Sequence, residues 1–219
     1  MMNIKRFVCN MLQENCYVVS DDTKECVIID CGAYYEEEHK AIERYIHDEG
    51  LRPMHLLATH GHLDHNFGNA AIGRAYGLNP EMSEKDAPLI AAAQTQAEAF
   101  YGVTLKDSIP AAGHYFTDDE ELHFGHHTLK VISSPGHSRG SVCFYCSEEK
   151  VLFSGDTLFA GSCGRTDFPG GSAREMQQSL SLLAELPLPD ATKVLPGHEG
   201  FSTLGQERST NPYMNGAWY

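Results

Sequence analysis

The sequence of 219 residues predicts a single α/β domain. Hydrophobic residues make up 42% of the chain and charged residues 21%, which is typical of a globular protein with one core. Short β-branched runs alternate with amphipathic stretches, as in sheets that are covered by helices. Four of the apolar runs lead directly into a polar loop that contains glycine. We therefore expect one α/β domain over residues 1–219 with a site built on these loops.

The first half of the chain predicts four strands and three helices. A turn at Asp21–Asp22 separates two of the strands and indicates a hairpin. The helices are expected to end near Gly50, Gly77 and Gly102, because glycine favours helix termination. The expected strands are 3–8, 16–20, 26–29 and 54–58, and the expected helices are 34–48, 65–76 and 86–100.

The second half predicts a run of strands, one helix and a final short strand. The expected strands are 121–124, 128–132, 141–146, 151–154 and 193–195, and the expected helix is 173–186. Cys143 and Cys146 form a CxxC pair inside a strand, where alternation directs their side chains to opposite faces. The chain from Gly200 onward is expected to be irregular, with Tyr213, Trp218 and Tyr219 packed on the domain.

Charge and composition limit the partners. The chain has 16 basic and 30 acidic residues, a formal charge of −14, so it repels nucleic acids and anionic membranes. The amino terminus lacks an unbroken apolar segment, and an odd number of cysteines, seven, argues against a disulfide framework. We expect a cytoplasmic protein that acts on a small molecule, without a nucleic-acid or membrane partner.

Histidine and aspartate follow the four apolar runs that lead into glycine-containing loops. The residues are His60, His62, Asp64 and His65 after the first run, His137 after the second, Asp156 after the third and His198 after the fourth. Imidazole and carboxylate ligands suit zinc, iron or manganese. The HGHLDH group is too dense for one ion, so two neighbouring ions are expected. A lone carboxylate such as Asp156 fits the role of a bridge between them.

Several motifs resemble the metallo-β-lactamase superfamily. They are IIDCG at 28–32, THGHLDH at 59–65, SPGHSRGS at 134–141, SGDTLF at 154–159 and LPGHE at 195–199. The resemblance covers nearly the whole chain and has the order of motifs found in the family. It implies an αβ/βα four-layer sandwich, in which two β-sheets lie face to face, helices cover the outside and metals bind at one edge.

The resemblance also implies a role for each residue of the site. His60, His62 and His137 would bind one metal, and Asp64, His65 and His198 would bind the other. Asp156 would bridge the two ions, and Asp30 would orient ligands by hydrogen bonding. Asp64 and Asp156 would be the catalytic residues, with Asp64 placed to orient the nucleophile. The expected cofactors are two divalent ions, zinc first, with iron or manganese as alternatives.

Within the superfamily the chain looks most like the glyoxalase II-like hydrolases. The stretch GDTLFAGSCGRTDFPGG at 155–171 follows the pattern of that group. This likeness implies that a metal-bound hydroxide attacks the carbonyl of a thioester or ester. Arg165, and second Arg139, would bind an anionic substrate. Two departures are that Asp167 replaces an expected tyrosine and that the chain ends at Tyr219, without the further helical segment of glyoxalase II.

Other functions stay open at this point. Persulfide dioxygenases share the fold and a CGRTDF stretch, and by that resemblance His60, His137 and Asp156 would hold one iron. The domain could also be a non-catalytic metal-binding module. β-Lactam hydrolysis is disfavoured because no export signal is visible, whereas lactone or phosphodiester hydrolysis fits the same ligands.

Overall fold

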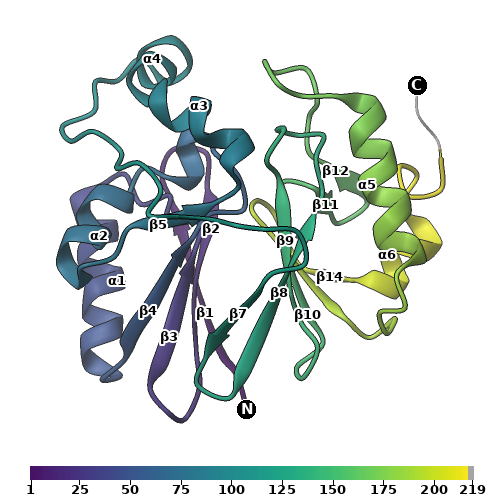
Figure 1. The fold of residues 1–219 in the computed structure, drawn as a ribbon, viewed down its shortest axis with the longest axis horizontal. Coiled ribbons are helices and arrows are strands. Elements are labelled where there is room, and N and C mark those ends of the chain that lie inside the picture. Colours follow the sequence, from purple (N-terminus) through teal and green to yellow (C-terminus); the bar gives the residue numbers. More distant parts are fainter. Residues whose placement is uncertain (217–219) are drawn as a thin grey trace.

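Two six-stranded β-sheets face each other at the centre of the computed structural model, which describes residues 1–216 (Figure 1). The first sheet has the order β1-β2-β3-β4-β5-β6, and the second has the order β14-β13-β10-β9-β8-β7. The strands of the first sheet are β1 (Asn3–Cys9), β2 (Glu14–Ser20), β3 (Glu25–Ile29), β4 (Arg52–Leu57), β5 (Pro80–Met82) and β6 (His114–Tyr115). Those of the second are β7 (Glu121–Phe124), β8 (His127–Ser133), β9 (Val142–Cys146), β10 (Val151–Gly155), β13 (Lys193–Pro196) and β14 (Ser202–Thr203). A separate small ribbon pairs β11 (Leu158–Phe159) with β12 (Ser162–Cys163).

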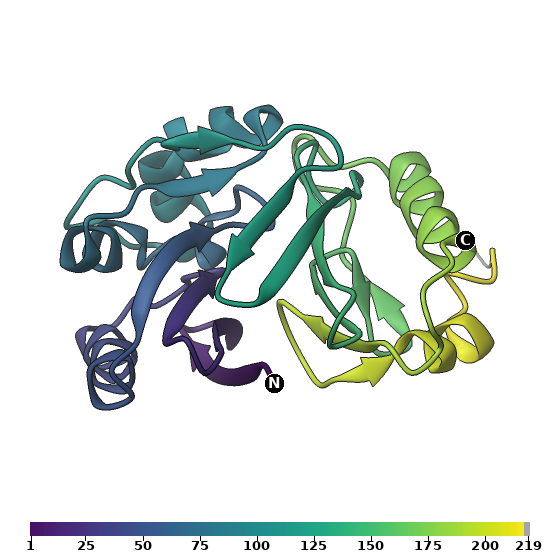
Figure 2. The same ribbon diagram turned by 60° about the horizontal axis from the view of Figure 1, so that its bottom comes forward.

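Helices cover the outer faces of both sheets. Helices α1 and α2 lie on the first sheet, and α5 and α6 lie on the second, as Figures 1 and 2 show. The α-helices are α1 (Glu36–Asp48), α2 (Asn69–Tyr76), α3 (Ala87–Ala91), α4 (Ala93–Gln96), α5 (Ala173–Glu185) and α6 (Leu204–Thr210). Short 3-10 turns span Leu63–His65 and Glu84–Asp86, and a π-helical turn spans Ala97–Tyr101. The expected αβ/βα four-layer sandwich is confirmed.

Alternation along each central strand builds this layering. In β2, Tyr17 and Val19 enter the core between the two sheets, whereas Cys16 and Val18 enter the core beneath α1 and α2. All four side chains are almost fully buried. A strand buried on both faces reads as a continuous apolar run, which is why the sequence identified β2 without showing which face it presents to which layer.

The CxxC pair illustrates the same rule in the second sheet. Cys143 packs in the core under α5, and Cys146 packs in the core between the sheets. The expectation that these two residues point to opposite faces of a strand is confirmed. Burial raises the pKa of both thiols to about 11, so they remain protonated and unreactive at neutral pH.

The predicted helix over 86–100 is wrong as a continuous element. The chain forms α3, breaks at Ala92, forms the single turn α4 and ends in the π-helical turn. Ala92 has a φ of −94° and a ψ of 12°, which departs from the helical conformation and interrupts the element. Ile90, Ala93 and Ala97 nevertheless pack in one apolar cluster.

Two further expectations need correction. The helix expected from residue 65 begins at Asn69, because Leu63–His65 forms a separate 3-10 turn. The carboxyl-terminal segment is not irregular, since it contains β14 and α6, and the Thr203 side chain caps α6 by accepting from the backbone of Gln206. Tyr213 packs against the core under α5, whereas Trp218 and Tyr219 lie outside the described residues. Among residues 1–216, no helix is long and apolar enough to cross a membrane.

Candidate metal centre

The seven histidine and aspartate side chains predicted as ligands meet at one edge of the sandwich. They lie on the loops that follow β4, β8, β10 and β13. Strands β10 and β13 run parallel, and β8 has the same direction because two antiparallel pairings separate it from β10. The carboxyl ends of three strands of the second sheet therefore face β4 of the first sheet across the interface.

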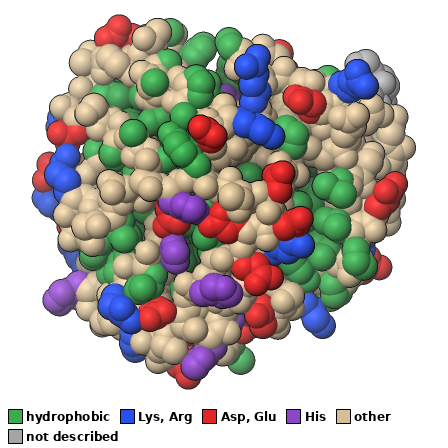
Figure 3. Space-filling model, viewed as in Figure 1, with side chains coloured by type: hydrophobic (Ala, Val, Ile, Leu, Met, Phe, Trp, Pro, Cys, Tyr) green, Lys and Arg blue, Asp and Glu red, His purple; other side chains and the backbone are tan. Residues whose placement is uncertain are grey.

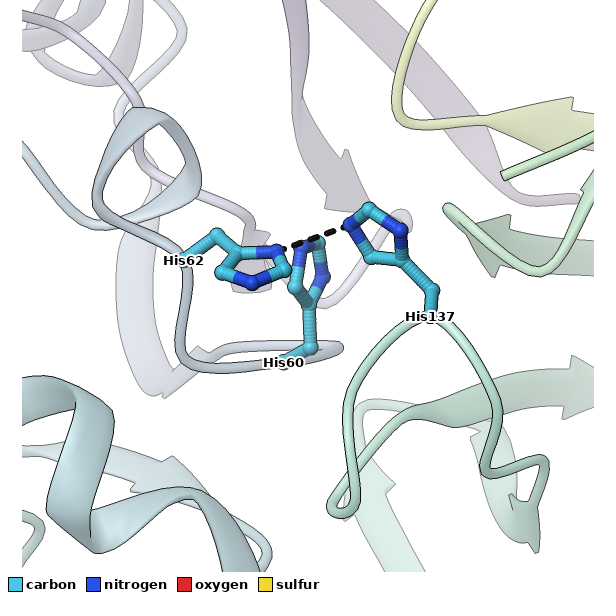
Figure 4. A group of neighbouring side chains, drawn as sticks. All are labelled: His60, His62 and His137. Carbon is cyan, nitrogen blue, oxygen red and sulfur yellow. Dashed lines mark hydrogen bonds between the residues drawn. The ribbon is translucent and has the colours of Figure 1, made fainter. Parts of the chain in front are cut away.

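Three histidines form one half of the site. His60 and His62 come from the loop after β4, and His137 comes from the loop after β8 in the other sheet (Figure 4). Their ligand nitrogens all lie within 4.8 Å of one another, and His62 Nδ1 is 2.8 Å from His137 Nε2. Nε2 of His60 is buried and has no hydrogen-bond partner in the described structure. Three imidazole nitrogens thus converge on one point.

Asp64, His65 and His198 form the other half. Nε2 of His198 lies 3.3 Å from Asp64 Oδ2 and 3.2 Å from His65 Nε2. Asp64 and His65 sit on the 3-10 turn directly after the first histidine pair, while His198 follows β13. The tight turn explains how adjacent residues in the HGHLDH motif can face two separate points.

Asp156 lies between the two halves. Its Oδ2 is 3.4 Å from His137 Nε2, and its Oδ1 is 3.4 Å from His65 Nε2. Oδ1 is buried without a hydrogen-bond partner in the described part of the chain. Gly197 makes this approach feasible, because a Cβ there would come within 2.5 Å of both Asp156 and His65.

Burial and neighbouring charge set the protonation of the site. Burial and the adjacent histidines hold the pKa of His60 well below its usual value, and they lower that of His62 to about 4. Burial alone would raise the pKa of Asp156, but His65, His137 and His198 outweigh it and hold that pKa well below the usual range. Against the effect of burial, Asp156 and Asp64 raise the pKa of His65 and His198, so these two rings hold a proton more firmly than His60 and His62. A cation that binds here would displace that proton, because a histidine ligand must be neutral.

The outward-facing nitrogen of three histidines is held by an acceptor. His65 Nδ1 donates to Asp30 Oδ2 at 3.1 Å, His137 Nδ1 to the Arg165 carbonyl at 2.7 Å, and His198 Nδ1 to the Leu12 carbonyl at 3.2 Å. A carbonyl can only accept, so these bonds leave Nε2 of each ring with a free lone pair that faces the site.

Asp30 also joins the first sheet to the loop after β4. Its carboxylate accepts from the backbone N–H and the hydroxyl of Thr59, both at 2.7 Å, in addition to His65. The residue has a φ of 53°, a left-handed conformation that aspartate tolerates better than most side chains. Asp30 thus orients one of the predicted ligands and the start of the loop that carries three others.

Asp86 is a buried residue of the site region that the sequence did not single out. It accepts from the Gly61 backbone at 2.8 Å, the Ser138 hydroxyl at 2.5 Å and the Gly140 backbone at 2.7 Å. One carboxylate therefore fastens the HGHLDH loop of one sheet to the His137 loop of the other. Its position near the start of an expected helix gave no signal of this role.

Five of the seven candidate ligands line the floor of a cleft of about 1220 Å³, namely His62, Asp64, His137, Asp156 and His198. Tyr101, at the end of the π-helical turn, donates its hydroxyl to Asp64 Oδ1 at 3.2 Å. Phe168 stands beside His62, with their ring centroids 5.5 Å apart. Neither residue was recognised from the sequence, because both lie far along the chain from the motifs they contact.

The two arginines predicted to bind substrate lie in different places. Arg165 lines the cleft, where its guanidinium stacks on Phe168 and pairs with Asp167 at 2.6 and 2.7 Å. Arg139 lines a second cavity of about 520 Å³, which it shares with Ser172 and Arg174 at the start of α5.

The donor set fits a pair of divalent cations. Six donors fall into two groups of three, with a carboxylate between them. Two buried atoms of this set, His60 Nε2 and Asp156 Oδ1, have no hydrogen-bond partner among the described residues. Imidazole and carboxylate donors suit zinc, iron and manganese alike. The open cleft above the donors resembles a catalytic site, whereas a structural zinc site is closed by four protein ligands.

Comparison with known proteins places the chain in a family. Residues 9–198 match the model of the metallo-beta-lactamase superfamily, and the chain belongs to it. It is 35% identical to hydroxyacylglutathione hydrolase GloC of Haemophilus influenzae over 98% of this chain and 99% of that protein.

Two solved structures are similar over their full length. The crystal structure of the B3 metallo-beta-lactamase BLEG-1 is 34% identical and superposes with a TM-score of 0.87, covering 98% of this chain and all of that one. The crystal structure of TTHA1623 in a di-iron-bound form is 36% identical with a TM-score of 0.84, covering 95% and 99%. The chain is thus a metallo-hydrolase homologue with a candidate divalent-metal site.

Proposed function

We propose that the protein is a dinuclear metal-dependent hydrolase that cleaves a thioester or ester. The observation that carries the proposal is the placement of Asp156 between the two donor triads. Its Oδ2 lies 3.4 Å from His137 Nε2 and 3.7 Å from His198 Nε2, and its Oδ1 lies 3.4 Å from His65 Nε2. In this proposal His60, His62 and His137 hold one ion, and Asp64, His65 and His198 hold the other. When bound, such a pair lowers the pKa of a coordinated water toward about 7 and polarises a carbonyl oxygen.

Side chains of the protein would orient the groups that react at the two ions. Asp64 has one oxygen facing His198 and the other held by the Tyr101 hydroxyl, so its carboxylate is fixed in direction. We propose that it orients the attacking water. A thiolate leaving group needs little protonation, which suits a floor with no spare general acid. The similarity to hydroxyacylglutathione hydrolase GloC supports a thioester substrate.

Arg165 is the proposed contact for an anionic part of the substrate. Its pairing with Asp167 offsets its charge, but the side chain is exposed at the cleft and can exchange that partner for a substrate carboxylate. Arg165→Ala should raise KM for anionic thioesters with little change in kcat. Arg139→Ala is the matched control, because Arg139 lies in the other cavity. Equal KM values for wild type and Arg165→Ala would contradict this role.

Metal quantification beside a substrate panel tests the whole proposal. We expect two divalent ions per chain after purification without chelators, zinc first, with iron a real alternative because a di-iron relative exists. Thioesters should be cleaved without oxygen uptake, and a chelator should abolish cleavage and lower Tm. One iron per chain with oxygen uptake on a persulfide would instead indicate a dioxygenase. The four further donors beyond His60, His137 and Asp156 favour hydrolysis.

A further inference from the structure

An apolar rim surrounds the polar floor of the cleft. Four of the nine large apolar side chains that the described part of the chain exposes line this one cleft, namely Val8, Met11, Leu12 and Phe100. Leu12 is 49% exposed and Phe100 is 56% exposed. An apolar surface that is concentrated above a polar centre is typical of a ligand-binding groove.

One wall of this rim is built directly on the ligand loops. Asn10 Nδ2 donates to the Gly32 and Asp64 carbonyls, both at 2.8 Å, and Asn10 Oδ1 accepts from the Leu12 backbone at 2.9 Å. The Leu12 carbonyl in turn accepts from His198. The turn between β1 and β2 is thus fixed to two of the ligand loops, those after β4 and β13, and the Leu12 side chain remains exposed at the cleft.

The opposite wall is a short ladder of aromatic rings. The Phe168 centroid is 5.5 Å from that of His62 and 5.5 Å from that of Phe100. The Arg165 guanidinium covers Phe168 at 4.0 Å. The ladder leads from a predicted metal ligand at the floor outward to the exposed ring of Phe100.

We propose that the substrate carries an apolar chain that lies between the Leu12 wall and the Phe100–Phe168 wall. This inference rests on the proposed hydrolase function, because it places the scissile carbonyl at the floor. A carbonyl placed between the two donor triads would have the Leu12 wall, joined to His198, on one side and the Phe168 wall, beside His62, on the other. Burial of an alkyl chain there removes apolar surface from water on both the protein and the substrate. The substrate class is a thioester or ester with an alkyl or aryl group of several carbons.

Two series of substrates test the proposal and locate the apolar group. The first varies the acyl chain from two to eight carbons on one small neutral thiol. The second keeps the acetyl group and lengthens the alkyl chain of the thiol. For the metal-loaded enzyme, we expect kcat/KM to rise about threefold per methylene in one series. The series that rises shows which side of the scissile bond occupies the rim. A flat or falling profile in both series would overturn the proposal.

Variants link the chain-length dependence to the rim. Leu12→Ser and Phe100→Ser should each reduce the ratio of kcat/KM between the longest and shortest substrates by about tenfold or more. Leu182→Ser is the matched control, because Leu182 is exposed on α5 and does not line the cleft. Unchanged ratios in both rim variants would overturn the proposal. The proposal would also be overturned if Leu12→Ser converted a dimer to a monomer and left the ratio unchanged. The rim would then be a contact with a second copy of the chain.

A binding measurement separates failure of this inference from failure of the proposed function. Non-hydrolysable alkyl thioethers of the same lengths are titrated into the metal-loaded protein by calorimetry. A Kd that falls about threefold per methylene supports the apolar subsite even if no thioester is cleaved, and absent cleavage then contradicts only the hydrolase. A Kd independent of chain length overturns the subsite, whatever the hydrolytic activity.

Discussion

The molecule holds two buried groups of histidine and acid, at opposite ends of the same strands. The metal centre lies at the carboxyl ends of β8 and β10. At their amino ends, His127 begins β8 and is held between Asp21 at 3.2 Å and Glu149 at 3.1 Å. We call Asp21, His127 and Glu149 the clasp, because Asp21 belongs to the first sheet's turn and the other two to the second sheet.

The two groups differ in how their polar atoms are satisfied. Both ring nitrogens of His127 face a carboxylate, so the clasp is complete without any ligand. In the candidate metal centre, histidine nitrogens face one another at 2.8 and 3.2 Å, and His60 Nε2 and Asp156 Oδ1 have no hydrogen-bond partner among the described residues. The residue types of the two groups are therefore the same and do not show which group could bind a metal. The difference is that donor atoms of the candidate metal centre face one another without hydrogen-bond partners. His127, directly before the expected strand 128–132, is buried in this pairing.

Removal of the bridging carboxylate should have the largest effect. Asp156→Ala should lower metal content below two ions per chain and reduce thioester hydrolysis by more than about a hundredfold, because both triads lose a shared ligand. Metal analysis and a thioester assay measure the two quantities. Asp21→Asn in the clasp is the control, and it should retain both ions. Full activity of Asp156→Ala with two ions bound would contradict the role of Asp156 as a ligand shared by the two ions.

Asp86 should show the next largest effect. Asp86→Ala leaves the buried Gly61 and Gly140 N–H groups without their acceptor, while the Ser138 hydroxyl keeps Ser141 Oγ at 2.8 Å. We expect a loss of about 3 kcal/mol in the free energy of unfolding, measured by urea denaturation of metal-free protein. Asp86→Asn keeps one acceptor oxygen and should lose less. Equal stability of wild type and Asp86→Ala would show that the two ligand loops are held by other contacts.

The clasp should make stability depend on acidic pH. Burial would raise the pKa of Asp21, but hydrogen bonds from Thr23, His126 and His127 outweigh it and lower that pKa to about 2. Because the folded-state pKa lies below the unfolded value, the stabilisation is present above about pH 4 and is lost as pH falls toward 2. It should amount to about 2 kcal/mol. The wild-type minus Asp21→Asn difference in unfolding free energy, measured without metal, should shrink over that range.

A constant difference between wild type and Asp21→Asn from pH 6 to pH 2.5 would contradict this account. It would mean that the clasp stabilises the folded state through packing and hydrogen bonding, and not through the charge of the Asp21 carboxylate. The metal-free protein is used because metal release at low pH would otherwise dominate the result.

The smallest effect is expected at a second contact between the sheets. His55 Nδ1 lies 2.7 Å from Glu81, and His55 Nε2 donates to the His123 carbonyl at 3.2 Å. On the face of the molecule that Figure 3 draws, histidine and acidic side chains gather near the middle. The hydrogen bond to Glu81 raises the pKa of His55 above its usual value against the effect of burial. The resulting stabilisation is complete below about pH 6.5 and is lost as pH rises through the folded-state pKa.

His55→Gln should therefore cost about 0.5 kcal/mol at pH 6 and less at pH 9, as measured by urea denaturation. An equal cost at both values would indicate that the contact depends on hydrogen bonding and not on the charge of the histidine. His47→Gln is a suitable control, because His47 is exposed at the end of α1.

The strands that the sequence located well are the long ones that alternate or are fully apolar, such as β2 and β8. Those it missed, including β5, β6 and β11, have two or three residues, too few for any period to appear. The seven candidate ligands could be identified from the sequence because each follows an apolar run and lies near a glycine. Asp86, Tyr101 and Phe168 carry no such local pattern, because their partners are distant in sequence.

The sequence by itself determined which donors the four loops offer and where the long strands lie, and the resemblance of its motifs implied the layering of the fold. Residue type fixes which donors a loop can offer, and period fixes which face of a strand is buried. Only the tertiary structure decided that Asp86 joins the two ligand loops and that Leu12 and Phe168 stand beside opposite triads. These contacts join segments that the chain brings together only when both sheets have formed, so no local pattern encodes them.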